Sequence, residues 1–197
     1  ISDEQLFNLL SEVKKINKGK KITFFEICTA AFFLQSMRSK SDITILESGL
    51  FNRFDACSCI KRNLASILTV IGIDHLDWLP RNDRNIDRII FEKASNLLNS
   101  KIIIAEQTNA KIIKIIKKVI KSNSSKKIIF GESFFYKKDS NGFLYKDDFG
   151  SIKLPLPNLL GDHQLSNVST AIATARNLNF KISDDHIRDG ITHIDSK

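Results

Sequence analysis

Short apolar runs rich in β-branched residues alternate with amphipathic helical patterns along the middle of this chain. The runs at 65–71, 101–105 and 126–130 contain few charges, which is typical of buried parallel strands. Residues 84–98 and 108–121 lie between them and repeat apolar side chains at helical spacing. Strands that alternate with helices of this length form right-handed βαβ units. The sequence therefore predicts an α/β fold with a mostly parallel sheet flanked by helices.

Two further segments precede this alternation. Residues 26–39 carry apolar positions at helical spacing and predict a helix packed on a core. Residues 43–46 form a short β-branched run and predict another buried parallel strand. Because we find no internal repeat and no linker rich in Pro, Gly or Ser, we expect residues 1–197 to form a single domain.

The pattern changes after Gly131. Two short aromatic runs flank Asn141-Gly142, a pair that favours a two-residue hairpin turn, and 151–156 adds a further strand. We therefore expect a small antiparallel β hairpin near 131–156. Residues 163–178 then predict a helix, and Ser183 is a plausible N-cap for a last short helix.

The chain is basic, with 30 Lys and Arg against 22 Asp and Glu and a formal net charge of +8. This balance favours anionic partners such as nucleotides, polyglutamate tails or, without sequence preference, nucleic acid. A solvated surface in an Ile-, Lys- and Asn-rich sequence is the simpler explanation of most of this charge. Charge alone leaves both interpretations open.

The cysteine pattern and hydropathy limit the compartment. Three cysteines, Cys28, Cys57 and Cys59, show no zinc-like spacing with histidine, which favours a reducing, cytoplasmic location. No apolar run approaches the roughly 20 residues that span a bilayer. We therefore expect no membrane partner.

Polar residues follow two of the predicted strands at their carboxyl ends, where open parallel sheets bind ligands. Glu47 follows 43–46, and His75 follows 65–71 with Asp74 beside it. A carboxylate and an imidazole that converge at one sheet edge suit Mg²⁺ or Mn²⁺ near phosphate. The alternative is a capping glutamate and an exposed loop histidine.

The spacing of the glycines excludes one phosphate-binding motif from this chain. A G-x-x-x-x-G-K-[ST] loop needs two glycines five positions apart so that backbone amides can surround phosphates. The eight glycines here never show that spacing. The chain itself therefore contains no such loop.

Six short motifs occur in the order typical of one enzyme family. They are Thr-Phe-Phe-Glu at 23–26, Leu-Glu-Ser-Gly-Leu-Phe-Asn-Arg-Phe-Asp-Ala at 46–56, Ile-Asp-His-Leu-Asp-Trp-Leu at 73–79, Glu-Lys-Ala at 92–94, Gly-Asp-His-Gln with Asn at 161–167, and Ile-Arg-Asp-Gly-Ile at 187–191. With them the chain resembles the central region of the folylpolyglutamate synthase/dihydrofolate synthase family of the Mur ligase superfamily.

The resemblance implies a Mur-ligase-type central ATPase domain, with a phosphate-loop segment before residue 1 and a C-terminal domain after residue 191 that lie outside this chain. It also implies the activity. Members transfer the γ-phosphate of ATP to a folate or dihydropteroate carboxylate, and the amine of L-glutamate then attacks the acyl phosphate. Mg²⁺ and ATP are the implied cofactor and co-substrate, and a monomer is the expected state.

Site residues carry over by motif position. The resemblance implies that Glu47 and His75 bind Mg²⁺, that Lys93 is carbamylated and that Asn167 contacts ATP. The residues implied to line the folate or pterin pocket are Thr23, Phe24, Phe25, Glu26, Phe54, Asp55 and Ala56.

The sequence departs from the family pattern where two glycines are replaced by Phe51-Asn52 and a third by Ser95. These changes remove permissive backbone positions. Together with the absent phosphate loop, they lead us to expect a truncated ligase without turnover of its own, which would need the remaining parts of the enzyme. A non-catalytic remnant is one alternative, and a basic α/β module that binds nucleic acid non-specifically is the other.

Overall fold

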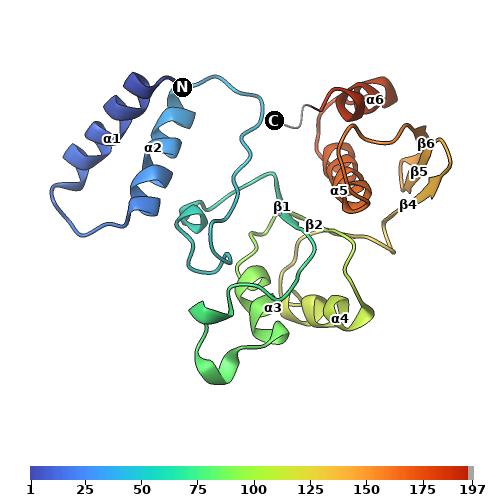
Figure 1. The fold of residues 1–197 in the computed structure, drawn as a ribbon, viewed down its shortest axis with the longest axis horizontal. Coiled ribbons are helices and arrows are strands. Elements are labelled where there is room, and N and C mark those ends of the chain that lie inside the picture. The colour runs from blue at the N-terminus through green and yellow to red at the C-terminus, as the bar shows by residue number, and fades with distance from the viewer. Residues whose placement is uncertain (195–197) are drawn as a thin grey trace. The chain divides into compact units, whose positions relative to one another are not determined.

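The computed structural model describes residues 1–194. The chain forms two compact units (Figure 1). The first unit comprises Ile1–Ile60, and the second begins at Lys61. Each unit is described separately below.

The first unit is a pair of helices followed by a long loop. Helix α1 spans Asp3–Asn17 and helix α2 spans Phe24–Arg38, so the predicted helix at 26–39 is confirmed and α1 is an addition to the prediction. Each helix begins with a capping box, formed by Ser2 with Gln5 and by Thr23 with Glu26. A small core of Leu9, Val13 and Ala31 joins the helices.

The prediction of a strand at 43–46 is wrong, because this segment has no regular structure. Ile43 and Ile45 are exposed, the latter at 85%. A strand needs a neighbour that pairs with its backbone, and the first unit contains no other strand among its residues. The β-branched residues therefore favour an extended strand, but no neighbouring strand in this unit pairs with them.

The second unit contains the predicted parallel sheet. Strands β1 (Ala65–Leu68), β2 (Lys101–Ile104) and β3 (Lys127–Ile129) pair in that order, with Ile67 opposite Ile103 and Ile103 opposite Ile128. Helices α3 (Ile86–Ala94) and α4 (Ala110–Val119) connect them as expected. Strand β1 is shorter than predicted and only partly buried, since Ile67 is exposed while Ser66 and Leu68 are buried.

A second sheet and two helices complete this unit. Strands β4 (Phe134–Asp139), β5 (Gly142–Asp147) and β6 (Gly150–Leu154) form the predicted antiparallel arrangement. The turn between β4 and β5 is Ser140-Asn141, one residue earlier than the predicted Asn141-Gly142, because Gly142 pairs with Asp139. Helices α5 (His163–Asn177) and α6 (Asp184–Thr192) follow, and Ser183 caps α6 as predicted.

The core of the second unit lies on both faces of the parallel sheet. Figure 1 shows α3 and α4 on one side of β1 and β2, and α5 on the other. Ile103 and Ile128 pack in one cluster with Phe134, Tyr145 and residues of α5, whereas the alternation of side chains directs Ile102 and Ile104 to the opposite face. Within residues 1–194, no helix is long and apolar enough to cross a membrane.

Candidate functional site

In the first unit, the loop that carries Glu47 is held by Asp55. One carboxylate oxygen of Asp55 accepts hydrogen bonds from the backbone N–H groups of Gly49 and Leu50, each at 3.0 Å. The other accepts from the N–H of Cys57 at 2.9 Å and so caps the short 3₁₀ helix η1 (Ala56–Cys59). Asp55, which we predicted to contact a pterin, therefore has a structural role at the base of this loop. The Glu47 side chain is exposed.

A buried cysteine also forms a hydrogen bond to this loop. The Cys57 thiol donates to the backbone carbonyl of Glu47 at 3.4 Å and is buried. Burial, assisted by the neighbouring Asp55 carboxylate, raises the pKa of the Cys57 thiol to about 11. Cys57 therefore remains a neutral thiol at physiological pH.

Phe51 occupies one of the positions where the family pattern has glycine. Its φ angle is +55°, in the left-handed region that glycine adopts freely and other residues adopt at a cost of roughly 1–2 kcal/mol. The loop thus retains a backbone conformation that suits glycine although the side chain has changed. The substitution introduces strain, and it has not abolished the turn.

The two segments predicted to form the pterin pocket lie in the same unit, where α2 packs against η1. Thr23 and Glu26 are occupied in the capping box: the Glu26 carboxylate accepts from both the N–H and the hydroxyl of Thr23 at 2.7 Å. The Phe25 ring lies against Gly49, where an added Cβ would come within 2.5 Å of it. Phe24 and Phe54 expose 79% and 83% of their surface. Aromatic side chains are thus available beside the Glu47 loop.

In the second unit, His75 and Lys93 are connected through Asp74. His75 is exposed and has a φ angle of +50°, at the start of the 3₁₀ turn η2 (Leu76–Trp78). The Lys93 ammonium lies 3.0 Å from Oδ2 of Asp74, while Oδ1 of Asp74 is buried and has no hydrogen-bond partner within residues 1–194. The structure therefore brings Asp74, beside His75, into contact with Lys93.

Sequence reasoning missed the residues that follow β2. The Gln107 side chain accepts from the N–H of Ile71 at 3.0 Å and donates to the carbonyls of Thr69 and Ala105 at 3.1 and 3.0 Å. It thereby joins the carboxyl ends of β1 and β2. The signal was present, because a polar residue after a buried strand falls at the edge where ligands bind.

Glu106 is the second residue that the sequence analysis did not single out. Its carboxylate accepts a hydrogen bond from the Tyr136 hydroxyl of β4 at 2.6 Å. Burial and this carboxylate raise the pKa of Tyr136 well above its usual value, so the phenol remains protonated. The pair links the parallel sheet to the antiparallel one.

Asn167 lies in the second turn of α5 and is exposed. Its amide donates to Gln164 at 3.0 Å, and Gln164 in turn lies 3.1 Å from the ring of His163. Helix α5 packs on β2 and β4. The start of this helix therefore presents three polar side chains from one motif.

The side chains described above provide only some of the ligands that a divalent cation needs. No set of three or more His, Cys, Asp or Glu side chains within residues 1–194 is close enough to hold a metal ion. His75 and the unpaired oxygen of Asp74 nevertheless offer nitrogen and oxygen donors of the kind that Mg²⁺ and Mn²⁺ accept. Glu47 belongs to the other unit, so its predicted pairing with His75 remains a prediction.

Comparison with known proteins identifies the family to which this chain belongs. The profile described as "Mur ligase middle domain" matches residues 3–175, which is most of the chain. The chain belongs to the Mur ligase middle domain family. This membership confirms the resemblance inferred from the six motifs.

The curated relatives of this Mur ligase middle domain are dihydrofolate synthase/folylpolyglutamate synthases. The protein of Escherichia coli (strain K12) is 28% identical over 92% of this chain and 41% of its own length. That of Buchnera aphidicola subsp. Acyrthosiphon pisum is 29% identical over 98% of this chain and 45% of its own length. The chain therefore spans less than half the length of these relatives.

Solved structures agree with the fold. Escherichia coli FolC in complex with DHPP and ADP superimposes with a TM-score of 0.85 at 26% identity, covering 98% of this chain and 44% of FolC. A folylpolyglutamate synthase/dihydrofolate synthase of Yersinia pestis gives a TM-score of 0.83 at 22% identity, with coverage of 98% and 45%, and so supports the fold alone. The predicted α/β class is confirmed.

Proposed function

We propose that this Mur ligase middle domain is the central part of an ATP-dependent ligase that joins L-glutamate to a folate or dihydropteroate carboxylate. The observation that carries the proposal is the Glu47 loop, which is held by Asp55 and flanked by exposed aromatic rings within one unit. Its similarity to Escherichia coli FolC, whose structure contains DHPP and ADP, supports the substrate class.

The proposed reaction has two steps. A substrate carboxylate oxygen attacks the γ-phosphorus of ATP, so that ADP leaves and an acyl phosphate forms. The amine of L-glutamate then attacks the acyl carbon, phosphate leaves, and the new amide releases a proton. A divalent cation would supply electrostatic stabilisation of the negative charge on the phosphoryl group.

Each residue has a proposed role. Glu47 and His75 would hold Mg²⁺, and Asn167, exposed in the second turn of α5, would contact ATP. Thr23, Phe24, Phe25 and Glu26 with Phe54, Asp55 and Ala56 would form the pterin side of the site. Asp55 would act there by positioning the Glu47 loop, because its carboxylate is occupied by backbone N–H groups.

Lys93 would act as a carbamate. Its neutral amine would combine with CO₂ to give a carbamate and a proton, and the new carboxylate would help to position a cation. The Lys93 amine lies 3.0 Å from Oδ2 of Asp74 in this structure, so that contact would have to open first.

We further propose that residues 1–197 act as one domain of the ligase and do not turn over alone, because no glycines here have the spacing of the G-x-x-x-x-G-K-[ST] loop. Binding of the pterin substrate is then the property to test. Calorimetry with dihydropteroate should show binding that weakens about tenfold in Phe54→Ala, the loss expected when an aromatic ring stops contacting a ligand.

Met37→Ala is the matched control for this experiment. Met37 is 85% exposed in the same unit and belongs to none of the family motifs. Its substitution should leave dihydropteroate affinity unchanged. Absence of binding to the unmodified chain, or equal weakening by both substitutions, would contradict the proposed pterin site.

A further inference from the structure

A cavity of about 420 Å³ lies in the second unit, and none of its lining residues has been assigned a role above. It is lined by two short segments, residues 61–63 and 95–99. The first segment ends one residue short of β1 and the second ends one residue short of β2, so the cavity lies at the amino ends of these parallel strands. The ligase reaction proposed above uses none of the lining residues, and it leaves this cavity without a function.

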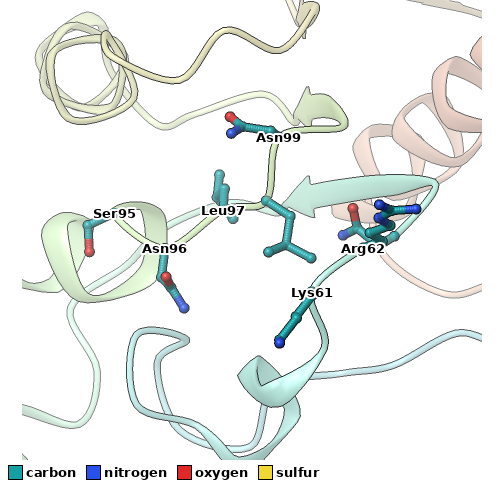
Figure 2. Close-up of a pocket in the computed structure, with 8 residues that line it drawn as sticks. Lys61, Arg62, Ser95, Asn96, Leu97 and Asn99 are labelled. Atoms are coloured by element: carbon teal, nitrogen blue, oxygen red, sulfur yellow. The ribbon is translucent and has the colours of Figure 1, made fainter.

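The charged groups of the lining are all positive. Lys61 and Arg62 contribute two cations, and no carboxylate is among the eight lining residues. Within residues 1–194, neither side chain forms an ion pair or hydrogen bond. Figure 2 shows Lys61 extending from the segment before β1 and Asn96 from the segment after α3, both toward the open space between them.

The backbone of residues 95–99 adds further donors. Two of its carbonyls already accept hydrogen bonds: Asn123 donates to the carbonyl of Leu97 at 2.8 Å, and the N–H of Ser100 donates to that of Leu98 at 2.8 Å. By contrast, the N–H groups of residues 96–99 donate no hydrogen bond to any of the described residues. A fixed loop with unpaired N–H groups beside two cations is an arrangement that binds anions.

The neutral side chains around the cavity are mainly polar. Asn96, Asn99 and Ser95 supply amide and hydroxyl groups, and two leucines provide the apolar part. The cavity is of the size found for small-molecule sites, roughly 300–1,000 Å³, and is much larger than one phosphate ion. Its occupant should therefore carry a polar body as well as an anionic group.

We propose that this cavity binds a small hydroxylated phosphate ester. A phosphate has enough oxygens to meet Lys61, Arg62 and several N–H groups together, whereas a carboxylate has two. The hydroxyl groups of the ester would bond to Asn96 and Asn99. This site is separate from the proposed ligase reaction, and its existence does not depend on it.

The test is a titration of the whole 197-residue chain followed by amide NMR at constant ionic strength. Glycerol 3-phosphate should shift the signals of residues 61–63 and 95–99 and bind more tightly than inorganic phosphate. Glycerol without phosphate and glutarate, a dicarboxylate, should produce little shift. Equal binding of glutarate would contradict the phosphate class, and equal binding of inorganic phosphate would contradict the role of the hydroxyl groups.

Matched variants distinguish binding in this cavity from non-specific attraction of the anion to the positively charged surface. Lys61→Ala/Arg62→Ala should weaken glycerol 3-phosphate binding about tenfold or more, the loss expected for a charge-assisted hydrogen bond. Lys111→Ala/Lys114→Ala removes the same charge from exposed positions of α4 and should leave affinity unchanged. Asn96→Ala, which keeps the charge, should also weaken binding. Equal affinity in all variants, or shifts spread over the surface lysines, would overturn the proposal.

Discussion

At the residue scale, Phe51 determines how strained the Glu47 loop is. The loop conformation there has a positive φ, which glycine adopts freely and a residue with a Cβ adopts only with strain. Sequence comparison indicated only that a glycine had been replaced. The structure adds that the turn persists around the new side chain.

Phe51→Gly should be more stable than Phe51→Ala by about 1 kcal/mol, because both lack the ring and only glycine removes the strain at positive φ. Chemical denaturation of the two variants would measure the difference. At Met37, inside helix α2, the order should be reversed, with alanine more stable than glycine. If the alanine variant were more stable than the glycine variant at both positions, Phe51 would not be strained.

The cysteines also differ at the residue scale. Cys57 is buried and its thiol has a raised pKa of about 11, whereas Cys59 is exposed. Because the thiolate is the reactive form, Cys57 should react very slowly at pH 8 and faster as the pH approaches 11. Peptide mapping after iodoacetamide treatment should find Cys59 modified first. Equal modification of both cysteines at pH 8 would show that the Glu47 loop is open in solution.

At the element scale, the parallel strands and their helices could be predicted from the sequence because their side chains are both apolar and periodic. Strand β2 shows this best, since Ile102, Ile103 and Ile104 are fully buried. The segment at 43–46 shows the limit of such reasoning: composition favours a strand, but pairing depends on which backbone lies beside it. Hydrogen bonds between distant residues, such as those of Gln107 to β1, leave no local pattern.

Asp55→Ala should open the loop between Gly49 and Cys57, because three backbone N–H groups lose a charged acceptor. Hydrogen bonds to charged groups are worth about 1.5–3 kcal/mol, so amide exchange at Gly49 and Leu50 should accelerate by about tenfold or more. Asp42→Ala, at an exposed position of the same unit, is the control and should leave these rates unchanged. Unchanged exchange in Asp55→Ala would contradict the holding role of this carboxylate.

At the scale of the whole molecule, the residues proposed for the ligase reaction come from both units. Glu47 and the aromatic residues belong to the first, whereas His75, Lys93 and Asn167 belong to the second. Motif order in the sequence predicted both groups of residues, a prediction that is still to be tested, whereas Asp74 as the partner of Lys93 emerged only from the structure. The central proposal is that Glu47 and His75 bind one cation.

Paramagnetic line broadening by Mn²⁺ tests that claim most directly in the intact chain. The account predicts that Mn²⁺ broadens the amide signals of Glu47 and His75 at the same metal concentration, and that His75→Ala abolishes the broadening at both. Broadening at His75 with none at Glu47, or broadening at Glu47 that survives His75→Ala, would contradict a shared cation site.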